Sequence, residues 1–439
     1  MPETITFLAV SGVRVRNTLL DTHAVTLPGF VHRGRTIASL PSLGLLTIAA
    51  LTPPGYDLHY EDVIDPTDAE IDALPGDLVA IGALTARIDV AYRIADRLRG
   101  RGVTVVFGGL HAKVLPREVA QHADAVAVGE GEDLWPRIVA DWERGSLRRF
   151  YMEDRPGTYD LARAPLPRYD LLDMERYNRI TVQTSRGCPH DCEFCAASRL
   201  FGRYRRKPVP LVLRDIDAIR ARWPRPFVEF ADDNTFADPA WGTELLDGLR
   251  GRGVRWFTET DVSVADHVQL LDRLAPAGCR QLLIGFESPR RASLDGLDAR
   301  NWKLRRRDGY LRAIERIQTR GVSVNGTFIV GNDADTPDVF PEIEAFVRES
   351  GLAEVQVTVL TPFPGTRLAA RLAAEGRLLT RRYHDRCTLF DATFTPKNMS
   401  LEQLEAGMNW LFGRLYSDAA VQERKRGFLA MARSRRRAS

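Results

Sequence analysis

No stretch of the 439-residue sequence holds the roughly 20 consecutive apolar residues that a helix needs to cross a bilayer. The first residues, M-P-E-T-I-T-F, lack the basic segment and cleavage site of a secretory signal, so we expect a cytoplasmic protein. Its 61 basic residues nearly balance its 58 acidic ones, and a net charge of +3 argues against a dedicated nucleic-acid binder. The length predicts two or three domains, because a single core rarely exceeds about 300 residues.

Cysteine is also scarce, and three of the five cysteines lie in T-S-R-G-C-P-H-D-C-E-F-C (184–195), with the spacing C-x3-C-x2-C. An odd, clustered set does not form a disulfide framework and indicates metal or cofactor chemistry in a reducing compartment. Thiolates hold iron–sulfur clusters, and three ligands leave the fourth iron of a cubane cluster free for a substrate or cofactor. Structural zinc with His190 as fourth ligand is the weaker alternative, because the loop lacks paired C-x2-C halves.

Short apolar runs alternate with amphipathic helical stretches over residues 1–144. This alternation predicts a doubly wound parallel sheet of the α/β class, which binds ligands at the carboxyl ends of its strands. Two glycine-containing loops, Phe107–His111 (F-G-G-L-H) and Val128–Glu132 (V-G-E-G-E), fall at such ends. The expected strands are Ile5–Val10, Asp57–Val63, Leu78–Gly82, Val103–Phe107 and Ala125–Val128, and the expected helices are Ser39–Leu51, Ile88–Arg101, Pro116–His122 and Asp133–Arg144.

Residues 145–179 are rich in proline, arginine, tyrosine and aspartate, and we expect a packed linker there. Six further β/α units over 180–370 predict a partial (β/α)6 barrel, with its active site at the strand C-termini. A C-terminal helical region, 371–439, includes the expected helix Leu401–Tyr416. The barrel strands are expected at Ile180–Thr184, Phe227–Ala231, Arg255–Glu259, Gln281–Phe286, Ser323–Val330 and Glu354–Leu360, and the helices at Pro210–Arg222, Pro239–Arg252, Val264–Ala277, Gly309–Arg320 and Pro337–Ser350.

The cysteine loop follows the first barrel strand and has Phe194 before its last cysteine, and in this it resembles the radical S-adenosylmethionine (SAM) superfamily. E-F-A-D-D-N, I-G-F-E-S and G-T-F-I-V-G resemble the second, fourth and fifth strand ends of that family, and T-P-F-P-G-T-R-L resembles its sixth-strand loop. With the N-terminal domain included, the resemblance covers nearly the whole chain. It points to the subgroup with an N-terminal cobalamin-binding-type domain, which includes hopanoid methylases, bacteriochlorophyll cyclase relatives and antibiotic-biosynthesis enzymes.

The resemblance implies a [4Fe-4S] cluster on Cys188, Cys192 and Cys195, with SAM bound to the open iron through its amino and carboxylate groups. It also implies that Phe194 lies near the adenine of SAM. In this family the reduced cluster cleaves SAM to a 5′-deoxyadenosyl radical, which abstracts hydrogen from a small-molecule substrate. The electron comes from a donor such as flavodoxin or ferredoxin.

Residues at other strand ends take further roles by the same resemblance. Asp232 or Asp233 stands where relatives hold the amino group of SAM, a role that suits a carboxylate. Because D-D-N replaces the more common G-G-E, which aspartate contacts SAM stays open. Glu287 and Ser288 are implied at the ribose hydroxyls, and Gly331 lets the backbone approach the adenosine.

Cobalamin in the N-terminal domain would make C-methylation of a biosynthetic substrate, in secondary metabolism, the expected reaction. The stretch D-T-H-A-V-T (Asp21–Thr26) keeps the Asp and His of the cobalamin motif D-x-H-x-x-G but has Thr26 in place of glycine. We therefore do not expect His23 to ligate cobalt. Relatives without the motif also bind cobalamin, so its absence decides little.

Without cobalamin, the alternative is radical dehydration, elimination or rearrangement of a hydroxylated substrate such as an amino sugar. Under this alternative Glu259 or Asp261 acts as the general base for loss of water. Acids crowd the expected barrel mouth, which would suit a cationic or polyhydroxylated substrate, although solvation of strand ends explains them equally well. These acids are Asp232, Asp233, Glu259, Asp261, Glu287, Asp333 and Asp335. The sequence names neither the substrate nor the reaction.

Overall fold

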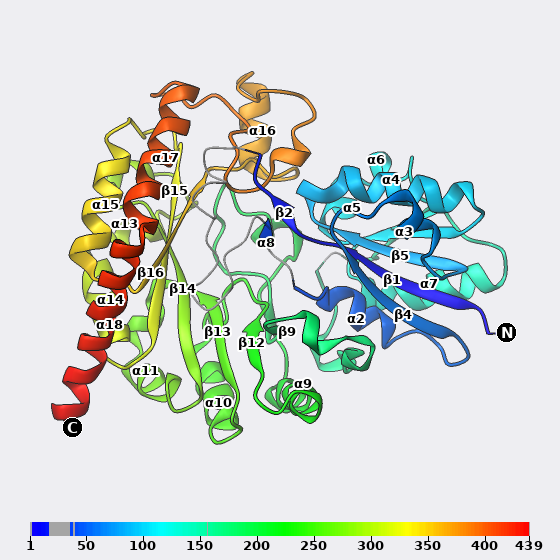
Figure 1. Cartoon of the computed structure of the whole chain (residues 1–439), viewed down its shortest axis with the longest axis horizontal. Coiled ribbons are helices and arrows are strands. Elements are labelled where there is room, and N and C mark those ends of the chain that lie inside the picture. The colour runs from blue at the N-terminus through cyan, green and yellow to red at the C-terminus, as the bar shows by residue number, and fades with distance from the viewer. Residues whose placement is uncertain (1, 17–35, 38–39, 156, 439) are drawn as a thin grey trace.

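The computed structural model describes residues 2–16, 36–37, 40–155 and 157–438 and contains two six-stranded parallel sheets followed by C-terminal helices (Figure 1). This architecture confirms the expected α/β class. The stretch Asp21–Thr26, with His23, lies outside the described residues. Within the described ranges, no helix is both long and apolar enough to cross a membrane.

The first sheet has the strand order β4-β1-β5-β6-β7-β8, with every neighbouring pair parallel. Its central strands are buried on both faces because helices cover both: in β1, Phe7 meets Trp135 of α7, and Leu8 joins the cluster beneath α4. The strands are β1 (Thr4–Val10), β4 (Asp57–Val63), β5 (Leu78–Ala83), β6 (Thr104–Gly108), β7 (Ala125–Val128) and β8 (Phe150–Met152), with a small pair β2 (Val13–Arg14) and β3 (Thr36–Ile37). The helices are α2 (Leu43–Ala49), α3 (Asp68–Asp72), α4 (Ile88–Gly100), α5 (Leu110–Val114), α6 (Pro116–Val119) and α7 (Gly131–Glu143).

Strand β8 lies in the stretch that the sequence suggests is a linker. It is a short edge strand in which Tyr151 alone is buried, donating its hydroxyl to Asp141 at 2.8 Å. Three residues with one buried side chain leave too little periodicity to be recognised in the sequence. We retain the limits 1–144, 145–179, 180–370 and 371–439 as a proposal, with β8 as part of the first sheet.

The second sheet has the order β16-β15-β14-β13-β12-β9, which is chain order read backwards, and all its pairs are parallel. Helices cover its outer face, as in a partial barrel (Figure 1). Its strands are β9 (Ile180–Val182), β12 (Phe227–Phe230), β13 (Arg255–Thr260), β14 (Cys279–Glu287), β15 (Ser323–Val330) and β16 (Glu354–Val359). The larger helices are α9 (Val209–Arg222), α10 (Pro239–Leu249), α11 (Val268–Leu274), α14 (Tyr310–Gln318) and α15 (Val339–Ser350), and shorter ones are α8 (Ala197–Leu200), α12 (Arg291–Leu294) and α13 (Trp302–Arg306).

The expected helix Val264–Ala277 is divided in the structure. A 3-10 turn, η5 (Val262–Asp266), precedes α11, and His267 between them has an extended ψ of 81°. The turn begins at Asp261, whose side chain accepts a hydrogen bond from the backbone of Ser263 and so caps η5. The cap therefore fixes the position of Asp261 at the end of β13.

The C-terminal helices lie against the outer helices of the barrel at its β16 edge (Figure 1). Helix α17 (Leu401–Tyr416) has the predicted bounds, packs on α15 and reaches the edge strand through Tyr416, whose hydroxyl donates to Val355. Gly407 permits this approach, because a Cβ there would lie 2.0 Å from the ring of Phe340. The other elements of the region are α16 (Arg367–Ala374), η7 (His384–Arg386) and α18 (Asp418–Ala438).

A buried group of ion pairs joins the first sheet to the second. Arg186, two residues before the first cysteine of the loop, contacts Glu130 at 2.5 Å and Glu132 at 2.6 Å, and Arg205 contacts Glu130 at 2.9 Å. Arg186 lies on β10 (Ser185–Arg186), which pairs with β11 (Arg205–Arg206). We call Arg186, Arg205, Glu130 and Glu132 the domain joint. It holds the carboxyl ends of the two sheets toward each other.

The barrel core depends on Trp256, which is fully buried in β13, stacks on Phe230 with ring centroids 4.8 Å apart and donates to the carbonyl of Ala277. We expect Trp256→Ala to lower the free energy of unfolding by about 3–5 kcal/mol, because it removes both packing and a buried hydrogen bond. Trp410→Ala is the matched control, since Trp410 is 43% exposed on α17, and we expect a change of about 0.5 kcal/mol or less. Thermal unfolding at one scan rate compares them, and equal shifts in Tm would contradict this account of the core.

Candidate cluster and cofactor sites

The cysteine loop leaves the end of β9 and is fixed from the C-terminal side by α16. Arg367 contacts the carboxylate of Asp191 at 2.5 Å, and Arg371 makes two hydrogen bonds to Glu193, at 2.7 and 3.0 Å. The backbone N–H of Leu368 donates to the carbonyl of Glu193. The acidic residues between the cysteines thus act as anchors of the loop.

The surroundings of the thiols suit a metal cluster. Burial raises the pKa of Cys188 to about 11 and that of Cys192 to about 12, so both are protonated at neutral pH unless a cation is bound. Iron would supply that positive charge and displace the protons. Among the described residues, the three cysteine sulfurs do not lie close enough together to surround a single ion, within 4.8 Å of one another. This favours a cluster on the loop over a single zinc ion.

His190 does not turn toward the thiols. Its Nε2 lies 2.9 Å from the Asp261 carboxylate, and its ring lies against Trp302 with centroids 4.3 Å apart. Asp261 also accepts hydrogen bonds from Asn234, at 2.7 Å, and from Ser263. Burial alone would raise the pKa of Asp261, but these hydrogen bonds outweigh it and hold the pKa below its usual range. Asp261 is thus poorly suited to accept a proton, and we propose that it positions the loop.

Asn234 links Asp261 to the first cysteine. Its Nδ2 lies 3.9 Å from the Sγ of Cys188, and its Oδ1 accepts from the hydroxyl of Thr260. Asn234 is almost fully buried. Sequence reasoning quoted it in D-D-N but assigned it no role, because its function lies in contacts between two strand ends distant in sequence.

The structure separates the two aspartates that the sequence left as alternatives. Asp232 is buried and saturated: it accepts from the backbone of Thr184 and Ser185 and from the hydroxyls of Thr184 and Thr235. Asp233 is only partly buried and accepts from the backbone of Gly187 at 3.0 Å. Burial, followed by repulsion from Asp232, raises the pKa of Asp233 to about 6. Asp232 therefore ties β9 to β12, and Asp233 has capacity for a ligand.

Glu287 is held by a lysine that sequence reasoning did not single out. Lys303 Nζ lies 2.7 Å from Glu287 Oε1 and donates to the carbonyl of Gly285, and both charged side chains are buried. Glu287 sits at a bulge of β14 with φ 63°, a left-handed conformation that costs about 1–2 kcal/mol for a non-glycine residue. Lys303 also faces Cys192, and its charge opposes the rise in that thiol's pKa caused by burial. Ser288 follows and is fully buried.

Phe194 lines a cavity beside the cysteine loop, and Gly331 directly precedes Asn332, another residue of its wall. Gly331 has φ 97°, and its N–H donates to Asp335, a buried carboxylate that also accepts from Asn332. The cavity measures about 610 Å³, is lined by Phe194, Asn332 and Leu360 among others, and is rich in polar groups. We call it the loop-side cavity. Its place between the cysteine loop and the end of β15 suits the adenosine of SAM.

Glu259 differs from the other acids. Its side chain is exposed to solvent in the structure, yet it lies among protein atoms and other carboxylates at the end of β13. Desolvation by these surroundings, followed by repulsion from Glu229 and Asp233, raises its pKa to about 8. Glu259 therefore has the accessibility and the affinity for protons that Asp261 lacks.

Most of the acids at the barrel mouth are bound to other protein groups. Asp333 pairs with Arg371 at 2.7 Å and Arg377 at 2.8 Å. Asp335 is fully buried in the turn at Gly331. Of the seven acids that the sequence places at this mouth, only Asp233 and Glu259 have few hydrogen-bond or ion-pair partners among the described residues. The acid count alone is therefore weak support for a cationic substrate.

A second cavity of about 330 Å³ lies at the carboxyl end of the first sheet. Gly82, Gly108 and Gly129 border it at the ends of β5, β6 and β7, and α2 and α7 supply apolar walls. Gln183, Arg186 and Ala231 close it from the barrel side. We call it the sheet-end cavity; both predicted loops, F-G-G-L-H and V-G-E-G-E, contribute to it.

Three regions of the chain match known protein families. Residues 182–347 match the radical SAM superfamily, residues 38–139 match the B12 binding domain, and residues 366–439 match a domain of unknown function. The cysteine loop lies in the first of these regions and most of the sheet-end cavity in the second.

Other proteins resemble this chain over most of its length. The bacteriochlorophyllide d C-12(1)-methyltransferase of Chlorobaculum tepidum is 27% identical over 395 residues, covering 89% of this chain and 85% of that protein. The hopanoid C-2 methylase of Rhodopseudomonas palustris is 26% identical, covering 78% and 66%. The solved structure of TsrM, a radical SAM methyltransferase from Kitasatospora setae, has the same fold, with a TM-score of 0.67, 15% identity and full coverage of both chains. The chain belongs to the radical SAM superfamily, in the group with an N-terminal B12-binding domain, whose cofactors include a [4Fe-4S] cluster and SAM.

The two aspartates should respond differently to loss of charge. We expect Asp233→Asn to weaken SAM binding about 10- to 150-fold, because a charge-assisted hydrogen bond contributes about 1.5–3 kcal/mol, while leaving Tm unchanged. For the wild type, SAM affinity should fall as the pH drops below about 6, where Asp233 becomes protonated.

Asp232→Asn is the matched control. It should lower Tm, because an amide cannot accept all the donors that converge on Asp232. Calorimetric titration of the cluster-loaded protein with SAM, together with thermal unfolding, measures both effects. Unchanged SAM affinity in Asp233→Asn would remove Asp233 from the SAM site.

Proposed function

We propose that this chain is a cobalamin-dependent radical SAM enzyme that methylates a carbon atom of a small biosynthetic substrate. The observation that carries the proposal is the sheet-end cavity, whose walls come from both domains. Glycines at the ends of β6 and β7 face Arg186 and Ala231 at the barrel's strand ends across this one space. A cofactor in the cavity would therefore face the substrate of the barrel.

The residues of the cavity suit cobalamin. A parallel α/β sheet binds ligands at the carboxyl ends of its strands, where this cavity lies. Gly108 and Gly129 lack side chains that would fill it, and Leu45, Ile48 and Ile138 give apolar walls for a flat ring of the cofactor.

In the barrel, we propose that the three cysteines hold the cluster, Asp233 accepts hydrogen bonds from the SAM amino group, and Phe194 lies near the adenine. Lys303 fixes the Glu287 carboxylate, which would face the ribose, and Gly331 allows close approach of the backbone. Ser288, fully buried in this structure, would support Glu287 from behind. When bound, the cluster and SAM supply a 5′-deoxyadenosyl radical for hydrogen abstraction, and cobalamin supplies a methyl group. The protein's own contribution is to position these groups and to exclude water. A flavodoxin or ferredoxin would supply electrons.

The curated relatives support methylation, since both are named as acting in methyl transfer. The engagement of the mouth carboxylates by arginines and backbone donors speaks against the amino-sugar alternative, because few acids stay available for a cationic substrate. The observation that favours radical dehydration is Glu259, an accessible carboxylate with a raised pKa. We keep dehydration or rearrangement of a hydroxylated substrate as the second candidate.

The test of the proposal uses protein made anaerobically in a cobalamin-sufficient host. We expect about one cobalt and four irons per chain, as one cobalamin and one cubane cluster require, and formation of 5′-deoxyadenosine with reductant and SAM. Methyl-labelled SAM should transfer its label to substrate candidates or to the cobalamin. Protein that lacks cobalt yet produces 5′-deoxyadenosine would support the second candidate, and protein that forms no 5′-deoxyadenosine under any condition would refute both.

The sheet-end cavity can be filled by a single substitution. Gly108 has no close neighbour for an added Cβ except Ala127 at 3.9 Å, so Gly108→Ala should be accommodated and retain cobalamin. We expect Gly108→Leu to place a branched side chain in the cavity and to lower cobalt content at least about tenfold, because interiors accept extra volume poorly.

Iron content is the internal control, since the cluster loop lies outside this cavity. Both variants should hold as much iron as the wild type. Normal cobalt in Gly108→Leu would show that cobalamin binds elsewhere or not at all.

Glu259 separates the two candidate reactions. If the reaction is dehydration, turnover should rise with pH through about 8, where Glu259 loses its proton and becomes a base, and Glu259→Gln should abolish that rise and slow turnover about 100- to 10,000-fold. If the reaction is methylation, hydrogen abstraction and methyl transfer need no such base, and turnover should change little.

SAM binding should be the same in Glu259→Gln and in the wild type under either reaction. Rates measured with a saturating reductant across pH 6–9 decide the matter. A variant whose pH profile matches that of the wild type removes Glu259 as a base.

A further inference from the structure

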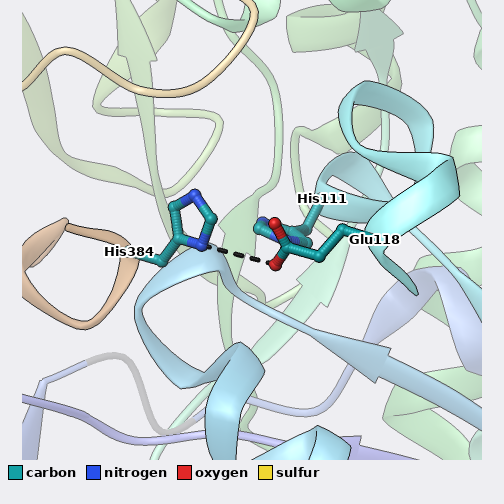
Figure 2. A group of neighbouring side chains, drawn as sticks. All are labelled: His111, Glu118 and His384. Atoms are coloured by element: carbon teal, nitrogen blue, oxygen red, sulfur yellow. Dashed lines mark ion pairs between the residues drawn. The ribbon is translucent and has the colours of Figure 1, made fainter. Parts of the chain in front are cut away.

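Two histidines and a glutamate converge outside the cysteine loop. His111 comes from α5 of the first domain, Glu118 from α6, and His384 from η7 of the C-terminal region (Figure 2). Their nearest ligand atoms all lie within 4.8 Å of one another. Both histidines are more than nine-tenths buried, and Glu118 is partly exposed. Figure 2 shows the ion pair between His384 and the Glu118 carboxylate, and the His111 ring beside that carboxylate.

The distances fit ligands of one ion better than hydrogen-bond partners. His111 Nε2 is 3.7 Å and His384 Nδ1 is 3.6 Å from Glu118 Oε1, which is too long for a hydrogen bond. Both ring nitrogens are buried and have no hydrogen-bond partner, a state that costs free energy. Ligands about 2.0–2.1 Å from a tetrahedral ion are about 3.3–3.4 Å apart. A small movement would thus bring these atoms to coordination distance.

The groups behind the cluster orient it in the way that metal sites require. The other ring nitrogen of His111 lies 3.3 Å from the Thr85 hydroxyl, which leaves Nε2 directed at Glu118. The hydroxyl of Tyr92 donates to Glu118 Oε1 at 3.1 Å. Such outer partners fix the tautomer and the orientation of ligating side chains.

We propose that His111, Glu118 and His384 form a binding site for a divalent transition-metal ion, with zinc as the best fit. Two imidazoles and one carboxylate are a common donor set for zinc. The exposed side of Glu118 leaves room for a water molecule as the fourth ligand.

The ion would join two parts of the chain, and among the described residues no other group of possible metal ligands does so. His111 and Glu118 lie in the region that matches the B12 binding domain, and His384 lies in the region that matches a domain of unknown function. The same region carries α16, whose arginines hold the cysteine loop. The site would therefore clamp the C-terminal region over the first domain, and it is independent of the proposed methylation.

The experiment uses the full-length holoenzyme, dialysed against a zinc buffer, with zinc counted by mass spectrometry. We expect about one zinc per chain and a zinc-edge absorption spectrum with nitrogen and oxygen ligands only, as this donor set requires. Zinc should also raise Tm, because an ion that binds only the folded chain stabilises it.

His384→Ala and Glu118→Gln remove one ligand each from different parts of the chain. Since loss of outer partners alone costs about 10- to 100-fold in metal affinity, each variant should bind zinc about 100-fold or more weakly. His122→Ala is the matched control: His122 is a nearby histidine that stacks on Tyr92, with ring centroids 4.0 Å apart, but contributes no ligand, and its loss should leave zinc affinity unchanged. Cobalt and iron contents, measured in the same samples, report separately on cobalamin and the cluster.

Three results would overturn the proposal. The first is a zinc content of the wild type no higher than that of Glu118→Gln. The second is sulfur ligands in the zinc spectrum, which would place the ion on cysteines, and the third is a loss of zinc affinity in His122→Ala as large as in the ligand variants. If His384→Ala does not fold, Glu118→Gln and the spectrum of the wild type still decide.

Discussion

The domain joint is the interaction on which the arrangement of both proposed cofactor sites depends. Arg186 is largely buried between Glu130 and Glu132 and lies two residues before Cys188. One side chain therefore fixes both the first domain and the start of the cysteine loop. Removing these charges from water is costly, and a buried ion pair often adds little net stability. In this protein the domain joint fixes orientation. It holds the strand ends of two parallel sheets against a shared cavity, and such strand ends are where parallel sheets bind ligands.

A chain of polar contacts continues from the joint into the barrel. Asp232 ties β9 to β12, and Asn234 and Asp261 connect the Cys188 thiol to the end of β13. These carboxylates are saturated by protein donors, which keeps them in one position and withholds them from proton transfer. Asp233 and Glu259 are set apart by their accessibility. We therefore propose that the other acids of the barrel mouth build the site and that these two can act in it.

Much of the fold could be predicted from the sequence, because strand and helix periodicity is local. β4, β7, β15 and α17 have the expected bounds, and the cysteine spacing indicates the cluster. The use of the acids could not be predicted, since the partners of Asp261 and Asp333 come from distant elements. Lys303 carries no motif, and its role follows from the bulge at Glu287. The sequence shows His111 only as the last residue of F-G-G-L-H. Its contact with His384 could not be predicted, because tertiary packing alone brings the two together.

The central claim, that the cobalamin and cluster sites face each other across the joint, is tested most directly by electron paramagnetic resonance of the holoenzyme. The relaxation of cob(II)alamin would be compared with the cluster oxidised and with the cluster reduced. Because the cavity is bounded by Arg186 and Ala231 beside the cysteine loop, the account predicts faster cob(II)alamin relaxation when the cluster is reduced and paramagnetic. Relaxation that does not depend on the state of the cluster would contradict it.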